Sequence, residues 1–259
     1  MIDIASVGGI LLAIVGVLGG LVIEGGSIAQ VTQPTAMMIV LGGTLGAVML
    51  QFPLSVFGAA LRQFMRVFIS RGTRNEAIVA QLVLFAVKAR KSGIVSLDAD
   101  LSLVQDKFLK QALMLAIDGT EPAAVRQIMQ LELENGAEFE ERIPQVFESA
   151  GGFAPTVGII GAVIGLIQVM QRLDDINQVG RGIAIAFVAT IYGVGLANLV
   201  FLPAAGKLRI RQQEEHMVRE MMLEGVISIQ EGMNPRMIEI KLRTYLSSGR
   251  KIDAPGGAA

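Results

Sequence analysis

The amino-acid sequence predicts an all-α polytopic membrane protein, with four transmembrane helices and a helical cytoplasmic domain between the second and the third. Only 17 % of the 259 residues are charged and 52 % are hydrophobic, whereas about a quarter of the residues in a soluble domain are charged. The charges are unevenly distributed, because the first 61 residues hold only Asp3 and Glu24. No segment has the alternation of apolar and polar residues that is typical of a strand.

Four runs without charge are long enough for membrane helices, since a bilayer crossing takes about 20 mostly apolar residues. They comprise residues 4–23, 34–61, 153–170 and 182–203. We expect the first to be a helix of the mature protein and not a signal peptide, because no Lys or Arg precedes it and no clear cleavage site follows it. The second run is expected to continue past the bilayer surface.

The distribution of basic residues predicts the orientation in the membrane. The positive-inside rule assigns loops rich in Lys and Arg to the cytoplasm, and two segments of this chain are rich in them. These residues are Arg62, Arg66, Arg71, Arg74, Lys207, Arg209 and Arg211. The long segment after the second crossing and the tail are therefore predicted to be cytoplasmic, with the short links outside and both termini inside.

The sequence divides into four predicted parts. Residues 1–61 hold the first two crossings and a short periplasmic loop, and residues 62–149 form a cytoplasmic helical domain. Residues 150–206 hold the third and fourth crossings, and residues 207–259 form a cytoplasmic amphipathic tail.

Helical periodicity organises the cytoplasmic parts. We expect helices over residues 75–93 and 97–120, the second with acidic residues at its start. A third helix is predicted to begin at Glu121–Pro122 and to lead into the third crossing. The tail is predicted to contain a long helix, a break at residues 232–235 and a short helix, with disorder over residues 253–259.

The four crossings contain no internal Asp, Glu, Lys, Arg or His. An ion pathway ordinarily has an intramembrane carboxylate, which is kept for function because it costs about 2.5–3.5 kcal/mol at the bilayer centre. The chain therefore either conducts nothing or receives its carboxylate from a partner.

Other functional classes have no support in the sequence. It contains no cysteine, no phosphate-binding loop, no cluster of metal ligands and no nucleophile motif, so we predict neither an enzyme nor a metal site. The net charge of −1 gives no basic excess for nucleic-acid binding. The lone His216 is expected on the surface of the tail.

Small residues recur at helical spacing in all four crossings. Such residues let helices approach closely, so they favour a tightly packed bundle and, more weakly, oligomerisation. The pairs and the face concerned are Gly16–Gly20, Gly42–Gly46, Gly161–Gly165, and Ala186, Thr190, Gly193 and Ala197.

Two threonines and two prolines in the crossings each have two interpretations. The hydroxyls of Thr156 and Thr190 either bond to carbonyls of their own helix or face a polar path. Pro155 and Pro203 lie near the predicted cytoplasmic ends of adjacent crossings, where each acts either as a hinge or as a helix end.

Several motifs resemble a known family. The segments "FAPTVGIIGAVIGLIQVM" and "DDINQVGRGIAIAFVATIYGVGLANLVFLPAAGKL" resemble the paired core helices of the MotA/PomA flagellar stator subunits, within the MotA/TolQ/ExbB proton-channel superfamily. "ARKSGIVSLDAD" resembles the rotor-facing motif of that family, and "ILLAIVGVLGG" and "GVISIQEGMNPRMIEIKLRTYL" also fit. The resemblance covers nearly the whole chain.

This resemblance implies a function and partners. Such subunits form a pentameric ring in the bacterial inner membrane around a MotB-like dimer that supplies the ion-binding aspartate. Ion flow turns the ring, and the cytoplasmic segments act on the rotor protein FliG. The missing carboxylate of the four crossings agrees with this arrangement.

The resemblance also assigns residues. Pro155 and Pro203 match the two prolines that link ion binding to movement, and Thr190 matches the channel-facing threonine of the fourth crossing. Arg90 matches the rotor-contacting arginine, and Asp98 stands where the family usually has glutamate. We expect Arg90 and Asp98 to make salt-sensitive contacts with FliG; without the resemblance, both would be interpreted as residues of a solvated surface.

The identity of the coupling ion follows from two further positions. Sodium-type relatives tend to carry threonines at the places of Ala162 and Ala189, and the loss of two hydroxyls favours protons. Thr156 compensates in part for that loss, so a sodium-driven stator is the first alternative. An ExbB/TolQ-type energiser, which predicts three crossings, and a non-conducting membrane scaffold are the others. No cofactor besides the coupling ion is expected.

Overall fold

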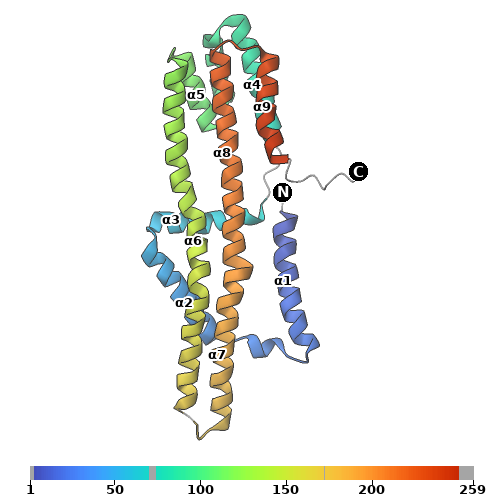
Figure 1. Ribbon diagram of the computed structural model, residues 1–259, viewed down its shortest axis with the longest axis vertical. Helices are drawn as coiled ribbons and strands as arrows, with labels where there is room; N and C mark the ends of the chain where they lie inside the picture. Colours follow the sequence, from blue (N-terminus) through green and yellow to red (C-terminus); the bar gives the residue numbers. More distant parts are fainter. Residues whose placement is uncertain (1–2, 70–73, 172, 251–259) are drawn as a thin grey trace. The chain divides into compact units, whose positions relative to one another are not determined.

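The computed structural model describes residues 3–69, 74–171 and 173–250 (Figure 1). Within these ranges, every regular secondary-structure element longer than one residue is a helix, as the sequence predicts. The basic residue Arg71 and the predicted disorder over residues 253–259 lie outside the described residues.

Four helices of the described chain are long and apolar enough to cross a membrane, in agreement with the prediction. The first is α1, Ile4–Ile23, and the second is α2, Pro34–Gln51, which follows the short 3₁₀ helix η1, Ile28–Val31. The others lie in α6, Pro122–Met170, and α7, Ile176–Leu196.

The second apolar run is not one helix. α2 ends at Gln51, Phe52 has extended backbone, and α3 begins after Pro53. Proline disfavours the helical conformation in the residue before it and has no N–H to continue the helix. The prediction of a continuous segment to residue 61 is therefore wrong. α3, Leu54–Phe64, runs across the axis of α6, and the 3₁₀ helix η2, Met65–Phe68, follows it (Figure 1).

The predicted helix over residues 97–120 begins later than its periodicity indicates. Ile94–Leu103 forms a 3₁₀ helix, η3, and the α-helix α5 spans Lys107–Ile117. Asp106 accepts hydrogen bonds from the backbone N–H groups of Phe108 and Leu109. Aspartate is a favoured N-cap, so the cap at Asp106, and not the earlier acidic residues, sets the start of α5.

The other helices predicted outside the four crossings are present. α4 spans Arg74–Ser92, and the helix predicted from Pro122 continues into the third crossing as α6. Gly93, Gly119 and Gly232 follow helix ends with φ values of 80°, 81° and 72°. This left-handed conformation is easy for glycine and common just beyond helix C-termini. The break at Gly232 separates two tail helices.

The tail helix is joined to the fourth crossing without interruption. α7 is followed by a π-helical segment, η4, over Ala197–Phe201, and then by α8, Leu202–Gln230. The short helix predicted at the end of the tail is α9, Pro235–Arg250.

The chain divides into two compact units, each made of two stretches of sequence. Unit 1 comprises residues 1–70 and 139–209, and unit 2 comprises residues 71–138 and 210–259. Unit 1 has a core at the junction of α2, α3, α6 and α8, which includes Val56, Val146 and Leu208. Unit 2 has a larger core drawn from α4, α5, α6, α8 and α9.

An ion-pair network joins three helices of unit 2. Glu224 of α8 accepts a hydrogen bond of 2.9 Å from Arg126 of α6 and is bonded to Lys241 of α9, which also contacts Ser228. Burial raises the pKa of Glu224, but the hydrogen bonds and charges of Arg126 and Lys241 outweigh it and hold that pKa below the ordinary 4.5. The network therefore favours the ionised carboxylate.

We expect Glu224→Gln to destabilise unit 2 by about 1–2 kcal/mol at pH 7, since a charged hydrogen-bond acceptor is lost while its half-exposed partners remain solvated. When folding lowers the pKa of a carboxyl group, that group stabilises the folded protein at pH values above its unfolded-state pKa. This stabilisation is lost as the pH falls through the folded-state pKa. Thermal unfolding of the full chain in detergent at pH 7 and pH 3 measures both effects. The gap between native protein and variant should shrink at the lower pH, and an equal gap at both pH values would contradict the assignment.

Candidate functional site

Neither predicted hinge proline ends its helix. Pro155 lies inside α6, which continues to Met170, and Pro203 lies in the first turn of α8, directly after the π-helical segment. The helix-end interpretation of both residues is therefore excluded, and each proline removes a backbone donor from a continuous helix.

The π-helical segment adapts the backbone to Pro203. The N–H of Leu202 donates to the carbonyl of Ala197, five residues earlier, and the side chain of Asn198 donates to the carbonyl of Val194 at 2.9 Å. Single π turns inside α-helices are frequent at functional sites and are one of the known causes of helix bending. Unit 1 thus has a defined point of altered helix geometry at the end of α7.

α6 and α7 are in backbone contact. A Cβ atom on Gly158 would lie 2.9 Å from the carbonyl oxygen of Ala189, and one on Gly193 would lie 2.5 Å from that of Ala154. A Cβ on Gly165 would lie 2.8 Å from the carbonyl oxygen of Gly182. The predicted small-residue faces of the third and fourth crossings therefore pack against one another.

The small-residue pairs of the first two crossings are not used in this way within the chain. Added Cβ atoms at Gly16, Gly20, Gly42 and Gly46 would meet nothing within 4 Å in the described structure. Gly43 is the close-packed glycine of α2, because a Cβ there would lie 2.7 Å from Val157 of α6. The spacing of glycines alone does not identify which helix face is packed.

The two threonines of the predicted ion pathway both bond to their own helix. Thr190, which is partly buried, donates to the carbonyl of Ala186 at 3.2 Å, and the exposed Thr156 donates to that of Phe153 at 2.8 Å. This satisfies the donor of each hydroxyl and leaves its lone pairs available as acceptors.

The two alanines differ in position. Ala189 is fully buried and packs with Ala36 and Val40 of α2, whereas Ala162 on α6 is partly exposed. Ala189 therefore lies in the interface between α2 and α7, and not on an exposed helix face of the isolated chain.

Tyr192 tethers the loop before α2, a role that was not predicted from the sequence. Its hydroxyl donates to the carbonyl of Val31 at 2.5 Å and accepts from the N–H of Gln33 at 3.1 Å. A tyrosine within an apolar crossing is a signal for such a bond, since a buried phenol needs a polar partner. Thr44 was also missed: it is fully buried on α2, and its hydroxyl has no partner among the described residues.

The motif that is predicted to face the rotor, residues 89–100 in unit 2, is a turn with an internal ion pair. Lys88 of α4 pairs with Asp100 of η3 at 2.6 Å and ties the two sides of the Gly93 turn together. Arg90 and Asp98 are exposed, and no ion pair or hydrogen bond of either side chain occurs within the described chain. The motif therefore presents the cations Arg90 and Lys91 and the anion Asp98 to the surroundings.

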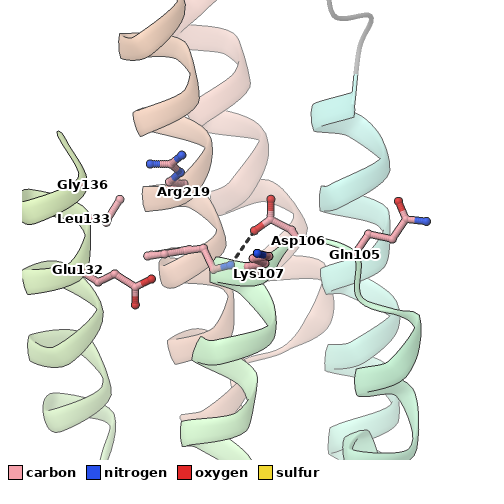
Figure 2. Close-up of a pocket in the computed structure, with 8 residues that line it drawn as sticks. Gln105, Asp106, Lys107, Glu132, Leu133, Gly136 and Arg219 are labelled. Atoms are coloured by element: carbon pink, nitrogen blue, oxygen red, sulfur yellow. Dashed lines mark hydrogen bonds between the residues drawn. The ribbon is translucent and has the colours of Figure 1, made fainter. Parts of the chain in front are cut away.

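Unit 2 also contains a cavity of about 400 Å³ at the N-terminus of α5 (Figure 2). Its charged lining includes both signs, from Asp106, Lys107, Glu132 and Arg219. One carboxylate oxygen of Glu132 is buried without a hydrogen-bond partner in the described structure. None of the site residues predicted from the sequence lines this cavity, and the described residues include no group of three or more potential metal ligands.

Comparisons with known proteins identify the family. Residues 101–221 match the MotA/TolQ/ExbB proton channel family, and residues 7–93 match the motility protein A N-terminal family. The chain is 35 % identical over 251 residues to motility protein A of Bacillus subtilis, and the match covers 96 % of this chain and 93 % of the relative. The chain belongs to the motility protein A family.

Other members and solved structures agree with this assignment. The chain is 31 % identical over 247 residues to the chemotaxis protein PomA of Vibrio alginolyticus, and the match covers 93 % of this chain and 97 % of the relative. The MotAB structure of C. jejuni matches with a TM-score of 0.90 and 29 % identity, over 98 % of both chains. The flagellar MotAB stator complex of Bacillus subtilis matches with a TM-score of 0.87 and 35 % identity, over 98 % of this chain and 100 % of that chain.

The resemblance to flagellar stator subunits drawn from the motifs is thereby confirmed, and the chain is a stator subunit of the inner membrane. The four candidate crossings of the described chain agree with this family and argue against the three-crossing ExbB/TolQ alternative.

Proposed function

We propose that this stator subunit conducts protons together with a MotB-like partner and converts their flow into torque on the rotor protein FliG. The observation that carries the proposal is the combination of a close-packed α6–α7 pair with crossings that contain no internal Asp, Glu, Lys, Arg or His. A proton path through a membrane ordinarily includes an intramembrane acid. Because this chain has none in its crossings, an aspartate of the partner completes the path.

The partner helix is expected to lie beside Thr190 and Thr156. Both hydroxyls have their donors satisfied by helix carbonyls, so they offer acceptor lone pairs to water molecules along a proton path. Water held in this way provides a hydrogen-bonded route to the partner carboxylate.

Protons are the proposed coupling ion because two oxygen ligands are absent. Ala162 and Ala189 have no hydroxyl, and Ala189 is buried against α2. A dehydrated metal cation needs several oxygen atoms in place of its water shell, whereas proton transfer needs one carboxylate and a chain of water.

The mechanical step is proposed to use Pro155 and Pro203. Both interrupt backbone hydrogen bonding inside continuous helices, and the π-helical segment lies next to Pro203. Protonation of the partner aspartate would bend α6 and α8 at these prolines and move the helices that continue into unit 2.

The assembly is proposed to be a homo-oligomer, with five copies around the partner dimer, both chain termini in the cytoplasm and lipid around the outer helices. The related structures are described as MotAB complexes. α1 supports association, because none of its residues is buried in the chain.

Swimming assays distinguish the two ions. Cells in which this chain and its cognate MotB-like subunit are the only stator should swim equally with and without sodium, because no sodium ligand set is present in α6 and α7. Addition of a protonophore should stop swimming within the same cells. Swimming that collapses on removal of sodium would overturn the proton assignment, and an absence of swimming in both media would overturn the stator function.

A further inference from the structure

Helix α1 is held only weakly by packing within the chain. It consists of 20 residues, nearly all apolar, and none of them is buried. Leu12 and Val15 on its middle turns are 75 % and 65 % exposed. Because helices in a membrane are held together mainly by van der Waals packing of the surfaces they share, packing contributes little to fixing α1 relative to the rest of unit 1.

The residue just before α1 has a different environment. Asp3 has a side-chain exposure of only 12 %, and one of its carboxylate oxygens lies 2.8 Å from the Nζ atom of Lys207. Its other carboxylate oxygen accepts the N–H of Ser6 at 3.1 Å and caps α1, and its own N–H donates to the carbonyl of Phe68 at 2.9 Å. A carboxylate shielded to this extent requires a charged or hydrogen-bonding partner.

The partner of Asp3 lies on the segment proposed to bend. Lys207 is one helical turn beyond Pro203 on α8, and the π-helical segment precedes them both. Its neighbour Leu208 is in the core that also contains Val67, the residue before Phe68. Asp3 is therefore bonded to both sides of one core, through Phe68 on η2 and through Lys207 on α8.

We infer that Asp3 is a positioning residue, which forms an ion-pair latch with Lys207 and ties the start of α1 to α8 just beyond the hinge. The latch makes α1 follow α8 when the π-helical segment bends. The movement of α1 rests on the proposed function, whereas the latch itself rests on the contacts of Asp3.

Cross-linking in membranes tests the latch independently of swimming. The chain contains no cysteine, so Ile4→Cys and Gly206→Cys introduce a single thiol pair beside the two latch residues. A flexible bifunctional thiol reagent should join them in the otherwise native chain. A second pair, Val22→Cys with Gly206→Cys, is the negative control, since residue 22 is about 27 Å from residue 4 along α1.

The latch variants separate charge from capping. Asp3→Asn keeps an N-cap residue but removes the charge, and Lys207→Gln removes the other charge, so each should lower the cross-linking yield about threefold or more. Lys207→Arg keeps the charge and should retain the yield. Arg209→Gln, which breaks the neighbouring Arg209–Glu148 pair of 2.8 Å, should leave it unchanged.

Equal cross-linking yields in the native chain, Asp3→Asn and Lys207→Gln would overturn the inference. A loss of yield in Arg209→Gln as large as that in Asp3→Asn and Lys207→Gln would also overturn it. Swimming speed with the cognate partner is the second readout. It should fall in Asp3→Asn and Lys207→Gln and recover in Lys207→Arg. If the native chain does not support swimming, the stator function fails while the cross-linking result still decides the latch.

Discussion

Gly193→Ala is expected to destabilise the α6–α7 pair by about 1–3 kcal/mol, the usual effect of excess volume in a tightly packed site, and to abolish swimming. The substitution adds one carbon atom at a point where it would lie 2.5 Å from the carbonyl oxygen of Ala154 and 3.1 Å from the Cα atom of Gly158. Both neighbours are backbone atoms of α6, so no side-chain rotation relieves the contact. The helices must separate, and a path along them is distorted.

Gly195→Ala is the matched control on the same helix. A Cβ at Gly195 meets nothing within 4 Å in the described structure, and alanine is favoured over glycine in a helix by about 1 kcal/mol. The same substitution two residues apart should therefore lower thermal stability at Gly193 and preserve or raise it at Gly195. Thermal unfolding of detergent-extracted protein measures this difference. Equal stabilities of the two variants would show that α6 and α7 do not touch at Gly193.

The positions of most helices follow from local chemistry and could be predicted. The apolar runs are long and free of charge, and Gly93 and Gly119 mark helix ends because few other residues adopt their φ values. The family could be recognised from motifs along most of the chain. These signals are read from neighbouring residues and need no knowledge of tertiary contacts.

Two helix boundaries were predicted wrongly because hydrophobic periodicity does not detect the individual residues that end or begin a helix. The apolar run continues through Phe52 and Pro53, so composition hides a break that the backbone chemistry of proline enforces. In the second case Asp106 forms a better cap than the acids near Leu97, and the start of α5 moves to Lys107.

The candidate site depends more strongly on tertiary structure. The sequence identifies Ala189 as a position without a hydroxyl, but only the packing of α2 against α7 shows that it is buried. The π-helical segment beside Pro203 is also invisible to a pattern search, since its five residues continue an apolar helix. The pairing of Asp3 with Lys207 joins residues from opposite ends of unit 1, and no local rule predicts it.

Reversing the charge of Arg90 is expected to abolish or strongly reduce torque without affecting the fold. Arg90 and Asp98 are exposed, and the turn that carries them is stabilised by a different pair, Lys88–Asp100. Arg90→Glu should therefore lower stability by no more than about 1 kcal/mol, the usual effect of an unfavourable charge in the last turn of a helix. Opposite-charge contacts with a rotor protein would become repulsive, and their strength would depend on ionic strength.

The measurements are swimming speed and the affinity of the chain for FliG over a range of salt concentrations. Arg90→Glu should weaken binding and flatten its salt dependence, whereas Arg236→Glu, the same charge change at an exposed residue of α9, should alter neither. A compensating charge reversal on the rotor protein should restore swimming to Arg90→Glu, because exchanging both signs recreates the attraction. Native binding and swimming in Arg90→Glu would instead show that this motif is an ordinary solvated surface and would overturn its assignment as a rotor contact.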